Sequence, residues 1–112
     1  MKISVLDIAQ VAHDVIRAHC GVAGVPNYPA WEDTPSEIRE RTIAGVQEQF
    51  DNPTPEQQHE AWVIKMENDG WTHGAAFDLI LKTHPGLVPF AERPQVDVIK
   101  QALFRSIVQS LR

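Results

Sequence analysis

Tryptophan and histidine are the residue types of this chain best suited to binding chemistry, and Trp71 stands in the most informative place. It follows Gly70, a residue type that commonly ends helices, at the start of a long segment broken by glycine and proline. A flat indole at the edge of such a loop can stack on a purine ring, a contact worth about 1–3 kcal/mol per base. The same side chain can instead fill the core beside the loop. The sequence leaves both roles open.

Basic and imidazole side chains lie near Trp71 in the sequence. Lys65 and Lys82 could donate to a phosphate group, although a solvated role is the ordinary one for each. His84 precedes Pro85, a pair typical of a structural turn in which the imidazole bonds to the backbone. A ligand contact is the alternative for His84.

The remaining aromatic candidates have stronger core alternatives. His13 and His59 occupy matching helix positions, which indicates matching packing and buried, hydrogen-bonded rings. Trp62 lies about one helical turn after His59 and favours the core. Trp31 stands in the equivalent loop of the first half of the chain. If a groove runs along a pseudo-twofold axis, Trp31 could face Trp71 across it.

The patterns that carry catalysis fail in this sequence. The segment His59–Val63 begins like the zinc motif H-E-x-x-H, but valine stands where the second metal ligand belongs. The five histidines show no close ligand spacing, and the single cysteine, Cys20, has none of the local patterns of a nucleophile. The sequence contains no phosphate-binding glycine loop and no nucleophile elbow. We therefore expect a protein that is not an enzyme and uses no cofactor and no metal.

Composition and charge bound the other function classes. A chain of 112 residues with 43% hydrophobic and 22% charged side chains predicts one domain over residues 1–112. Its net charge of −5 disfavours bulk binding to nucleic acid or to an anionic membrane. One cysteine and the lack of a long apolar run predict a cytoplasmic protein without a membrane span. A homo-oligomer stays open.

Four helices are expected, over residues 4–20, 35–51, 55–69 and 95–111, from apolar stripes at helical spacing. Ser4, Thr34 and Thr54 are the predicted N-caps, and proline follows both threonines at the first helical position. Gly21 and Gly70 are the predicted stops of the first and third helices. A short strand or hairpin is expected around residues 71–74 and 87–90, while the conformation of residues 77–82 is undecided.

A weak internal repeat relates residues 1–52 to residues 53–112. Residues 12–14 echo 58–60 on the first helix of each half, and 31–35 echo 90–94 before the second helix. Each half is thus a helix, a loop and a helix. The predicted fold class is mostly α, a pseudo-symmetric four-helix domain with a small β-hairpin or irregular loop in the second half.

Three separated segments in the second half resemble one known family. They are His59–Trp62 (H-E-A-W), Gly70–Gly74 (G-W-T-H-G) and His84–Phe90 (H-P-G-L-V-P-F). In this order they resemble the RyR domain, named after the repeat domains of ryanodine receptors, and the first half looks like the extension of single-copy bacterial or phage members. The sequence departs from the family pattern at His73, where tyrosine is usual, at Ala75, where proline is common, and at residues 78–81, which are more apolar than usual.

The resemblance implies a binding role for this chain. It associates the tryptophan of the G-W motif, here Trp71, with ATP-type ligands, and prokaryotic members have been proposed to sense nucleotide-derived signals in conflict between phage and host. We therefore expect a non-catalytic module that captures or senses a small nucleotide-derived molecule. The alternative is a module that binds a host or partner protein through the same surface. The candidate ligand-binding residues are Trp71, His73, Lys82, His84, Trp31, His59, Trp62 and Phe90.

Overall fold

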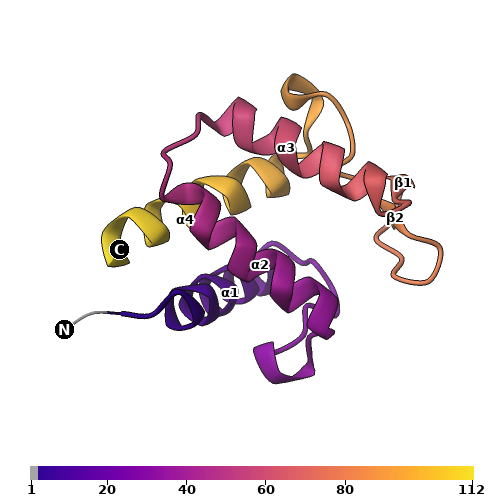
Figure 1. The fold of residues 1–112 in the computed structure, drawn as a ribbon. Coiled ribbons are helices and arrows are strands. Elements are labelled where there is room, and N and C mark those ends of the chain that lie inside the picture. The colour runs from indigo at the N-terminus through magenta and orange to yellow at the C-terminus, as the bar shows by residue number, and fades with distance from the viewer. Residues whose placement is uncertain (1–2) are drawn as a thin grey trace. The chain divides into compact units, whose positions relative to one another are not determined.

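A computed structural model describes residues 3–112, and most of these residues are helical. The described residues form four α-helices, two short 3-10 helices and two short strands (Figure 1). In chain order these are α1 (Val5–Val22), η1 (Trp31–Asp33), α2 (Ser36–Gln49), α3 (Pro55–Asn68), β1 (Thr72–His73), β2 (Thr83–His84), η2 (Phe90–Glu92) and α4 (Gln95–Leu111). The predicted mostly helical class and the four predicted helix positions are confirmed.

The chain separates into two compact units. The first contains the chain up to Asn52 together with Ile99–Arg112, and the second is the continuous segment Pro53–Val98. Helix α4 therefore begins in the second unit and contributes most of its length to the first. None of the helices in the described residues is long and apolar enough to cross a membrane.

The core of the first unit joins α1, α2, η1 and the later turns of α4. Helical spacing places one apolar side chain per turn on the inner face of each helix, so the stripes meet in a common interior. The buried members are Ile8, Ala9, Trp31, Val46 and Val108, and the partly buried residues packed against them are Val5, Ile43, Phe50, Phe104 and Leu111.

Two of the predicted helix starts are confirmed by their hydrogen bonds. The Ser4 hydroxyl accepts from the backbone N–H of Asp7 at 3.1 Å, at the start of α1. At the start of α3, the Thr54 hydroxyl accepts from the Gln57 N–H at 3.1 Å, and the Gln57 side chain accepts from the Thr54 N–H at 2.9 Å. This reciprocal pair satisfies two N–H groups that the helix itself leaves unbonded.

The predicted cap at Thr34 is wrong. The carbonyl of Pro35 accepts from Ile38 and Arg39, so α2 begins one residue later, and within the described residues no side chain caps it. The buried Thr34 hydroxyl instead donates to the carbonyl of Ala30 at 2.8 Å and lies 3.5 Å from Nε2 of His13. Burial decided this outcome, because a buried hydroxyl has to bond to the groups around it.

The predicted stops at the two glycines differ in outcome. Gly70 has a φ of 89°, and the N–H of the following residue, Trp71, bonds to the carbonyl of Met66 at 2.9 Å, which confirms the predicted end of α3. Gly21 does not end α1, because the helix continues to Val22. Gly24, with a φ of 78°, takes the corresponding position, and the next N–H bonds back to the carbonyl of Cys20 at 2.9 Å.

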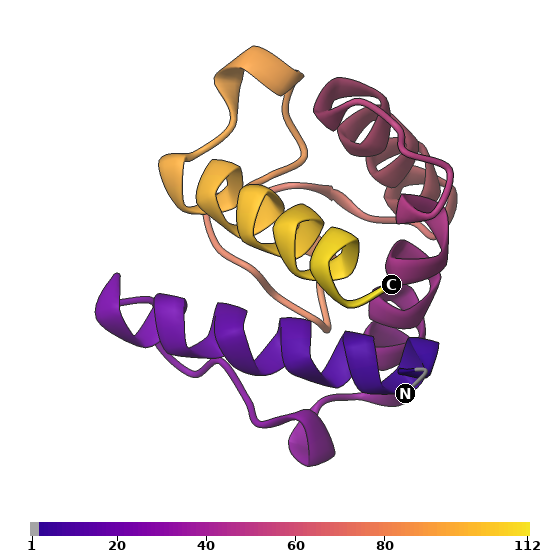
Figure 2. The same cartoon turned by 90° about the vertical axis from the view of Figure 1, so that its left-hand side faces the viewer.

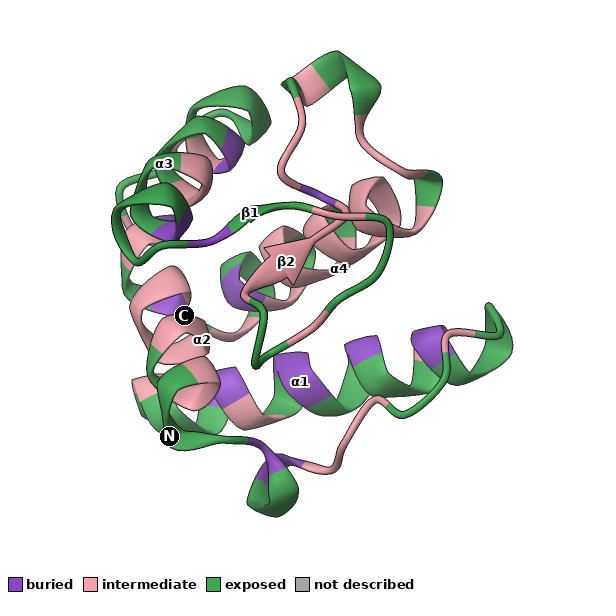
Figure 3. Cartoon of the chain, turned by 90° about the vertical axis from the view of Figure 1, so that its right-hand side faces the viewer, coloured by how far each residue is buried: buried purple, intermediate pink, exposed green. Residues whose placement is uncertain are grey.

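The strands pair differently from the expected hairpin. Thr72 and His73 pair in parallel with Thr83 and His84, so the partner of the first strand is not the segment 87–90. Parallel pairing needs the chain to turn back between the strands, and residues 74–82 do so in a loop that is mostly exposed (Figure 3). The undecided segment is thus the crossover of a two-stranded parallel sheet.

We predict that Thr54→Ala lowers the free energy of unfolding by about 0.5–2 kcal/mol, because the variant loses the cap of α3. Thr54 is exposed, so no core contact is removed with the hydroxyl. Urea denaturation followed by circular dichroism measures the effect. Thr54→Ser keeps the hydroxyl and should retain most of the stability. Equal midpoints for Thr54→Ala and the wild type would contradict the capping role.

Candidate functional site

A buried histidine holds the irregular loop of each unit against its first helix. In the first unit, Nε2 of His13 donates to the carbonyl of Pro29 at 2.8 Å. In the second, Nε2 of His59 donates to the carbonyl of Val88 at 2.7 Å. A carbonyl oxygen can only accept, so both rings carry their proton on Nε2 when neutral. The predicted matching packing of the two histidines is confirmed.

In both units a 3-10 helix follows the bonded carbonyl. The first residue of that helix is aromatic, and its ring packs against the same histidine. In the first unit, the loop after α1 runs back along that helix to η1 (Figure 2), where the Trp31 ring lies 5.5 Å from the His13 ring. In the second unit, Phe90 at the start of η2 lies 6.0 Å from the ring of His59. The internal repeat expected from the sequence is therefore present as repeated geometry.

The second loop is longer than the first and carries additional aromatic contacts. The histidine and its carbonyl partner are 16 residues apart in the first unit and 29 residues apart in the second. The extra length contains both strands and the crossover between them. Trp62, Trp71, Phe77 and His84 form the aromatic cluster of the second unit, and each of their rings contacts another member of the cluster.

Trp71 is the innermost member of the aromatic cluster. Its side chain is 1% exposed, and the ring of Phe77 stacks on it with centroids 5.6 Å apart and planes tilted by 30°. Phe77 itself is 52% exposed. The indole thus lies within the protein, with a half-exposed phenyl ring from the crossover loop on its face. A planar ligand could stack on Trp71 at that face only in the place that Phe77 occupies.

His84 contacts both Trp62 and Phe77 in edge-to-face geometry. Its ring lies 4.9 Å from that of Trp62 at 75° and 5.8 Å from that of Phe77 at 90°. Nδ1 of His84 accepts from the N–H of Gly86 at 2.9 Å, which fixes the turn after β2. The structural turn expected at this histidine is therefore present, and its ring is also half-buried in the aromatic cluster.

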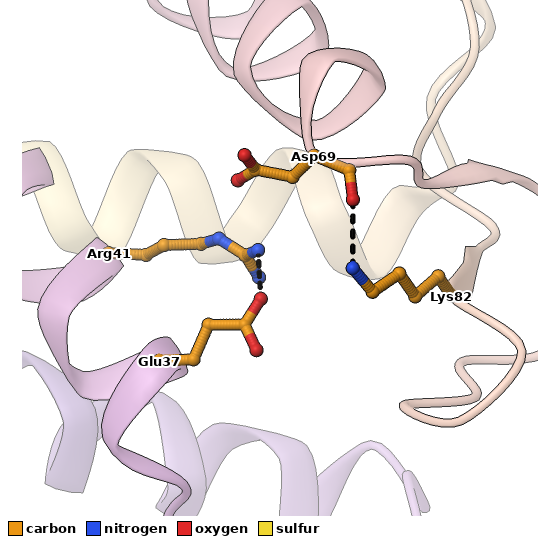
Figure 4. A network of polar contacts seen from close by, with 4 residues as sticks. All are labelled: Glu37, Arg41, Asp69 and Lys82. Carbon is orange, nitrogen blue, oxygen red and sulfur yellow. Dashed lines mark hydrogen bonds and ion pairs between the residues drawn. The ribbon is translucent and has the colours of Figure 1, made fainter.

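Lys82 is engaged with the end of α3. Its Nζ donates to the carbonyl of Asp69 at 2.9 Å, whereas the carboxylate of Asp69 points away from it (Figure 4). A cation at this place is favourable, because the last carbonyls of a helix carry partial negative charge. Lys82 has a φ of 55°, a left-handed conformation that bulky residues adopt with strain. Phosphate binding by Lys82 would compete with this bond.

The other candidate residues lie in different surroundings. His73 is exposed on β1. Phe90 is half-buried, and the guanidinium carbon of Arg93 lies 3.9 Å from the centre of its ring, a cation–π contact. Trp31 is buried in the core of the first unit. Phe77 was missed by the sequence analysis, since a lone phenylalanine in an irregular loop has no periodic pattern to mark it.

The close approach of the chain segments in the second unit depends on two glycines. A Cβ at Gly74 would lie 2.6 Å from Cβ of Thr83, across the pair of strands. A Cβ at Gly86 would lie 3.0 Å from both the ring of His84 and the Oδ2 of Asp97. The distance at Gly74 is too short for a Cβ unless the backbone or Thr83 shifts, whereas at Gly86 the neighbouring side chains would have to move by a few tenths of an ångström.

The chemistry of the first unit's loop is dominated by burial. Tyr28 packs 5.1 Å from the ring of His13, and Nζ of Lys100 lies 5.7 Å from the Tyr28 ring centre. Burial, with a smaller contribution from the charge of Cys20, raises the pKa of Tyr28 from 10.0 to about 12.

Among residues 3–112, no group of three or more histidine, cysteine, aspartate or glutamate side chains could hold a metal ion.

Each of the two mostly helical units thus contains a helix whose buried histidine bonds to the loop that follows, and the longer loop of the second unit carries the aromatic cluster. The family model of the RyR domain matches residues 31–111. The chain therefore belongs to the RyR domain family, as the three sequence segments predicted. No curated protein and no solved structure matches the chain.

We predict that Gly74→Ala lowers the free energy of unfolding by about 1–3 kcal/mol, because the added methyl group overpacks the strand contact with Thr83. Gly21→Ala is the control. Gly21 lies within α1, and a Cβ there meets nothing within 4 Å. This control should be stabilising by about 0.5–1 kcal/mol, since alanine favours helices. Chemical denaturation of both variants measures the effects, and a neutral Gly74→Ala would disprove the close packing.

The raised pKa of Tyr28 leads us to predict that the protein loses stability in strong alkali. The unfolded side chain ionises near pH 10 and the folded one near pH 12, so ionisation favours the unfolded chain between these values. Below pH 10 both states are protonated and the contribution is constant. The free energy of unfolding should fall more steeply between pH 10 and 12 for the wild type than for Tyr28→Phe. Parallel pH profiles from denaturant titrations would show that Tyr28 does not titrate in this way.

Proposed function

We propose that this domain is a non-catalytic binding module that captures a small nucleotide-derived molecule through the aromatic cluster of the second unit. The observation that carries the proposal is the stack of a half-exposed Phe77 on a buried Trp71. A purine ring can take the place of the phenyl ring on the indole. Family membership supports this role, because the resemblance associates the same tryptophan with ATP-type ligands.

The magnitudes favour such an exchange. An aromatic pair contributes about 0.5–1.5 kcal/mol beyond its area burial. Stacking of a base on an aromatic side chain contributes about 1–3 kcal/mol. Phe77 is held by a loop and has half of its surface in water, so its displacement removes little other burial. The two ranges overlap, so a base stacked on Trp71 can offset the loss of the phenyl ring, and the upper part of its range exceeds that loss.

Lys82 lies where it could bind the phosphate end of a nucleotide whose base stacks on Trp71. The side chain of Lys82 runs past Gly70, where a Cβ would lie 3.9 Å from its Cδ, next to Trp71 in the chain. A phosphate group that recruits Lys82 from the carbonyl of Asp69 would replace a neutral acceptor by a charged one, which makes a stronger hydrogen bond. His84, another member of the aromatic cluster, contacts the ring of Phe77 in edge-to-face geometry.

A second candidate function is supported by a different observation. The crossover loop exposes consecutive large aliphatic side chains at its end, which is unusual for a domain surface unless a partner covers them. On this basis the domain would be a protein-interaction module that uses the loop beside the aromatic cluster.

The exchange of Phe77 for a base predicts opposite effects for two variants. Trp71→Phe should weaken binding of the responding nucleotide by a few-fold, less than the about 5- to 150-fold expected for truncation to alanine, because it reduces the stacking surface without removing it. Phe77→Ala should strengthen binding by about 2- to 10-fold, because it removes the ring that competes with the ligand. Isothermal titration with ATP, a cyclic nucleotide and ADP-ribose measures both effects, and thermal shift confirms that each variant is folded.

Trp31→Phe is the matched control, since Trp31 is buried in the core of the first unit and the substitution should leave the affinity unchanged. Unchanged binding by a folded Trp71→Phe would sink the stacking role of Trp71. Weaker binding by Phe77→Ala would mean that the phenyl ring itself is the ligand's stacking surface. If none of the three ligands binds, the nucleotide proposal is wrong.

A further inference from the structure

The end of the crossover loop carries three consecutive aliphatic side chains that the fold leaves in water. These residues, Leu79, Ile80 and Leu81, are named the apolar tip. Ile80 is 91% exposed, Leu81 is 71% exposed and Leu79 is 37% exposed. Singly exposed aliphatic residues are ordinary on protein surfaces, but a consecutive run of them marks a site of interaction or a liability for aggregation.

Two backbone donors of the apolar tip already have partners within the loop. Asp78 and Thr83 close the loop by exchanging two backbone hydrogen bonds, at 3.0 and 3.1 Å. Oδ1 of Asp78 accepts from the N–H groups of Ile80 and Leu81, both at 2.9 Å. An apolar surface that covers the tip therefore leaves neither of these donors unbonded. The ordered turn also lowers the entropy lost on binding.

The charges around the apolar tip indicate which kind of surface could cover it. The segment Pro53–Val98 contains seven acidic and three basic side chains. Lys82, which follows the tip, donates to the end of α3, where Glu67 and Asp69 are exposed. An anionic membrane would be repelled by this acidic surface, and so would a second copy of the same unit. An apolar surface rimmed by lysine and arginine complements it.

We infer that the apolar tip inserts into an apolar surface with a basic rim on a partner protein. This inference rests on the second candidate function and names its surface and the chemistry of its partner. Leu79, Ile80 and Leu81 provide the apolar contact. The acidic side chains at the end of α3 orient the partner and raise the association rate, and this electrostatic contribution weakens with salt.

The test uses an amphipathic helical peptide of leucine and lysine, labelled for fluorescence anisotropy, as a probe of that partner chemistry. Ile80→Asp should weaken its binding by about 10-fold or more. Val22→Asp is the matched control, because Val22 is also 91% exposed and the charge change is the same, but Val22 lies at the end of α1. It should bind as the wild type does. The corresponding leucine–glutamate peptide should bind more weakly than the lysine peptide.

The remaining outcomes each decide against the inference in a distinct way. If the wild type binds the lysine peptide and both variants bind it equally well, the tip is not the surface, although the interaction function stands. If the wild type binds neither peptide, the second candidate function fails as well. Binding to phosphatidylcholine vesicles that only Ile80→Asp loses would assign the tip to lipid. Dimerisation in sedimentation equilibrium that only Ile80→Asp loses would assign it to a second copy.

Discussion

The hydrogen bond between a buried histidine and a loop carbonyl is the constraint on which both units depend. The loops after α1 and α3 contain little regular structure, so their backbone groups find few partners in a ladder. One imidazole on the preceding helix provides a fixed donor for each loop, at His13 and at His59. Loss of such a donor would leave a part-buried carbonyl without this hydrogen bond and the loop untethered, at a cost of up to about 1–3 kcal/mol. The aromatic residue two positions later then packs against the same ring.

The repeated geometry shows what distinguishes the second unit, where the binding site is proposed, from the first. Both units close the same histidine-centred turn, but the second does so across a longer loop. Among the additional residues, Phe77 packs against Trp71 and His84 packs against Trp62. The apolar tip lies between Phe77 and His84 in the chain. The glycines at 74 and 86 make this compact arrangement sterically feasible. The added loop thus combines little regular structure with chemically varied side chains, a combination often found where scaffolds bind ligands.

The two proposed activities use neighbouring parts of this one loop. A ligand on Trp71 requires Phe77 to move, and Phe77 stands just before the hydrogen-bonded turn that presents the tip. Occupation of the aromatic cluster would therefore act on the same short segment that a partner protein would contact. If both proposals hold, this connection would couple the binding of a small molecule to a protein contact.

Local chemistry was predictable from the sequence because its causes lie within a few residues. Helix positions, the Thr54 capping box, the Gly70 stop and the family motifs all follow from spacing over one or two turns. The matching packing of His13 and His59 followed from the internal repeat. Only the tertiary structure decided which hydroxyl caps a helix, since Thr34 is buried and bonds elsewhere, and which segments pair as strands. It also decided that Trp71 is covered by Phe77, because burial and stacking depend on residues brought together by folding rather than by their order in the chain.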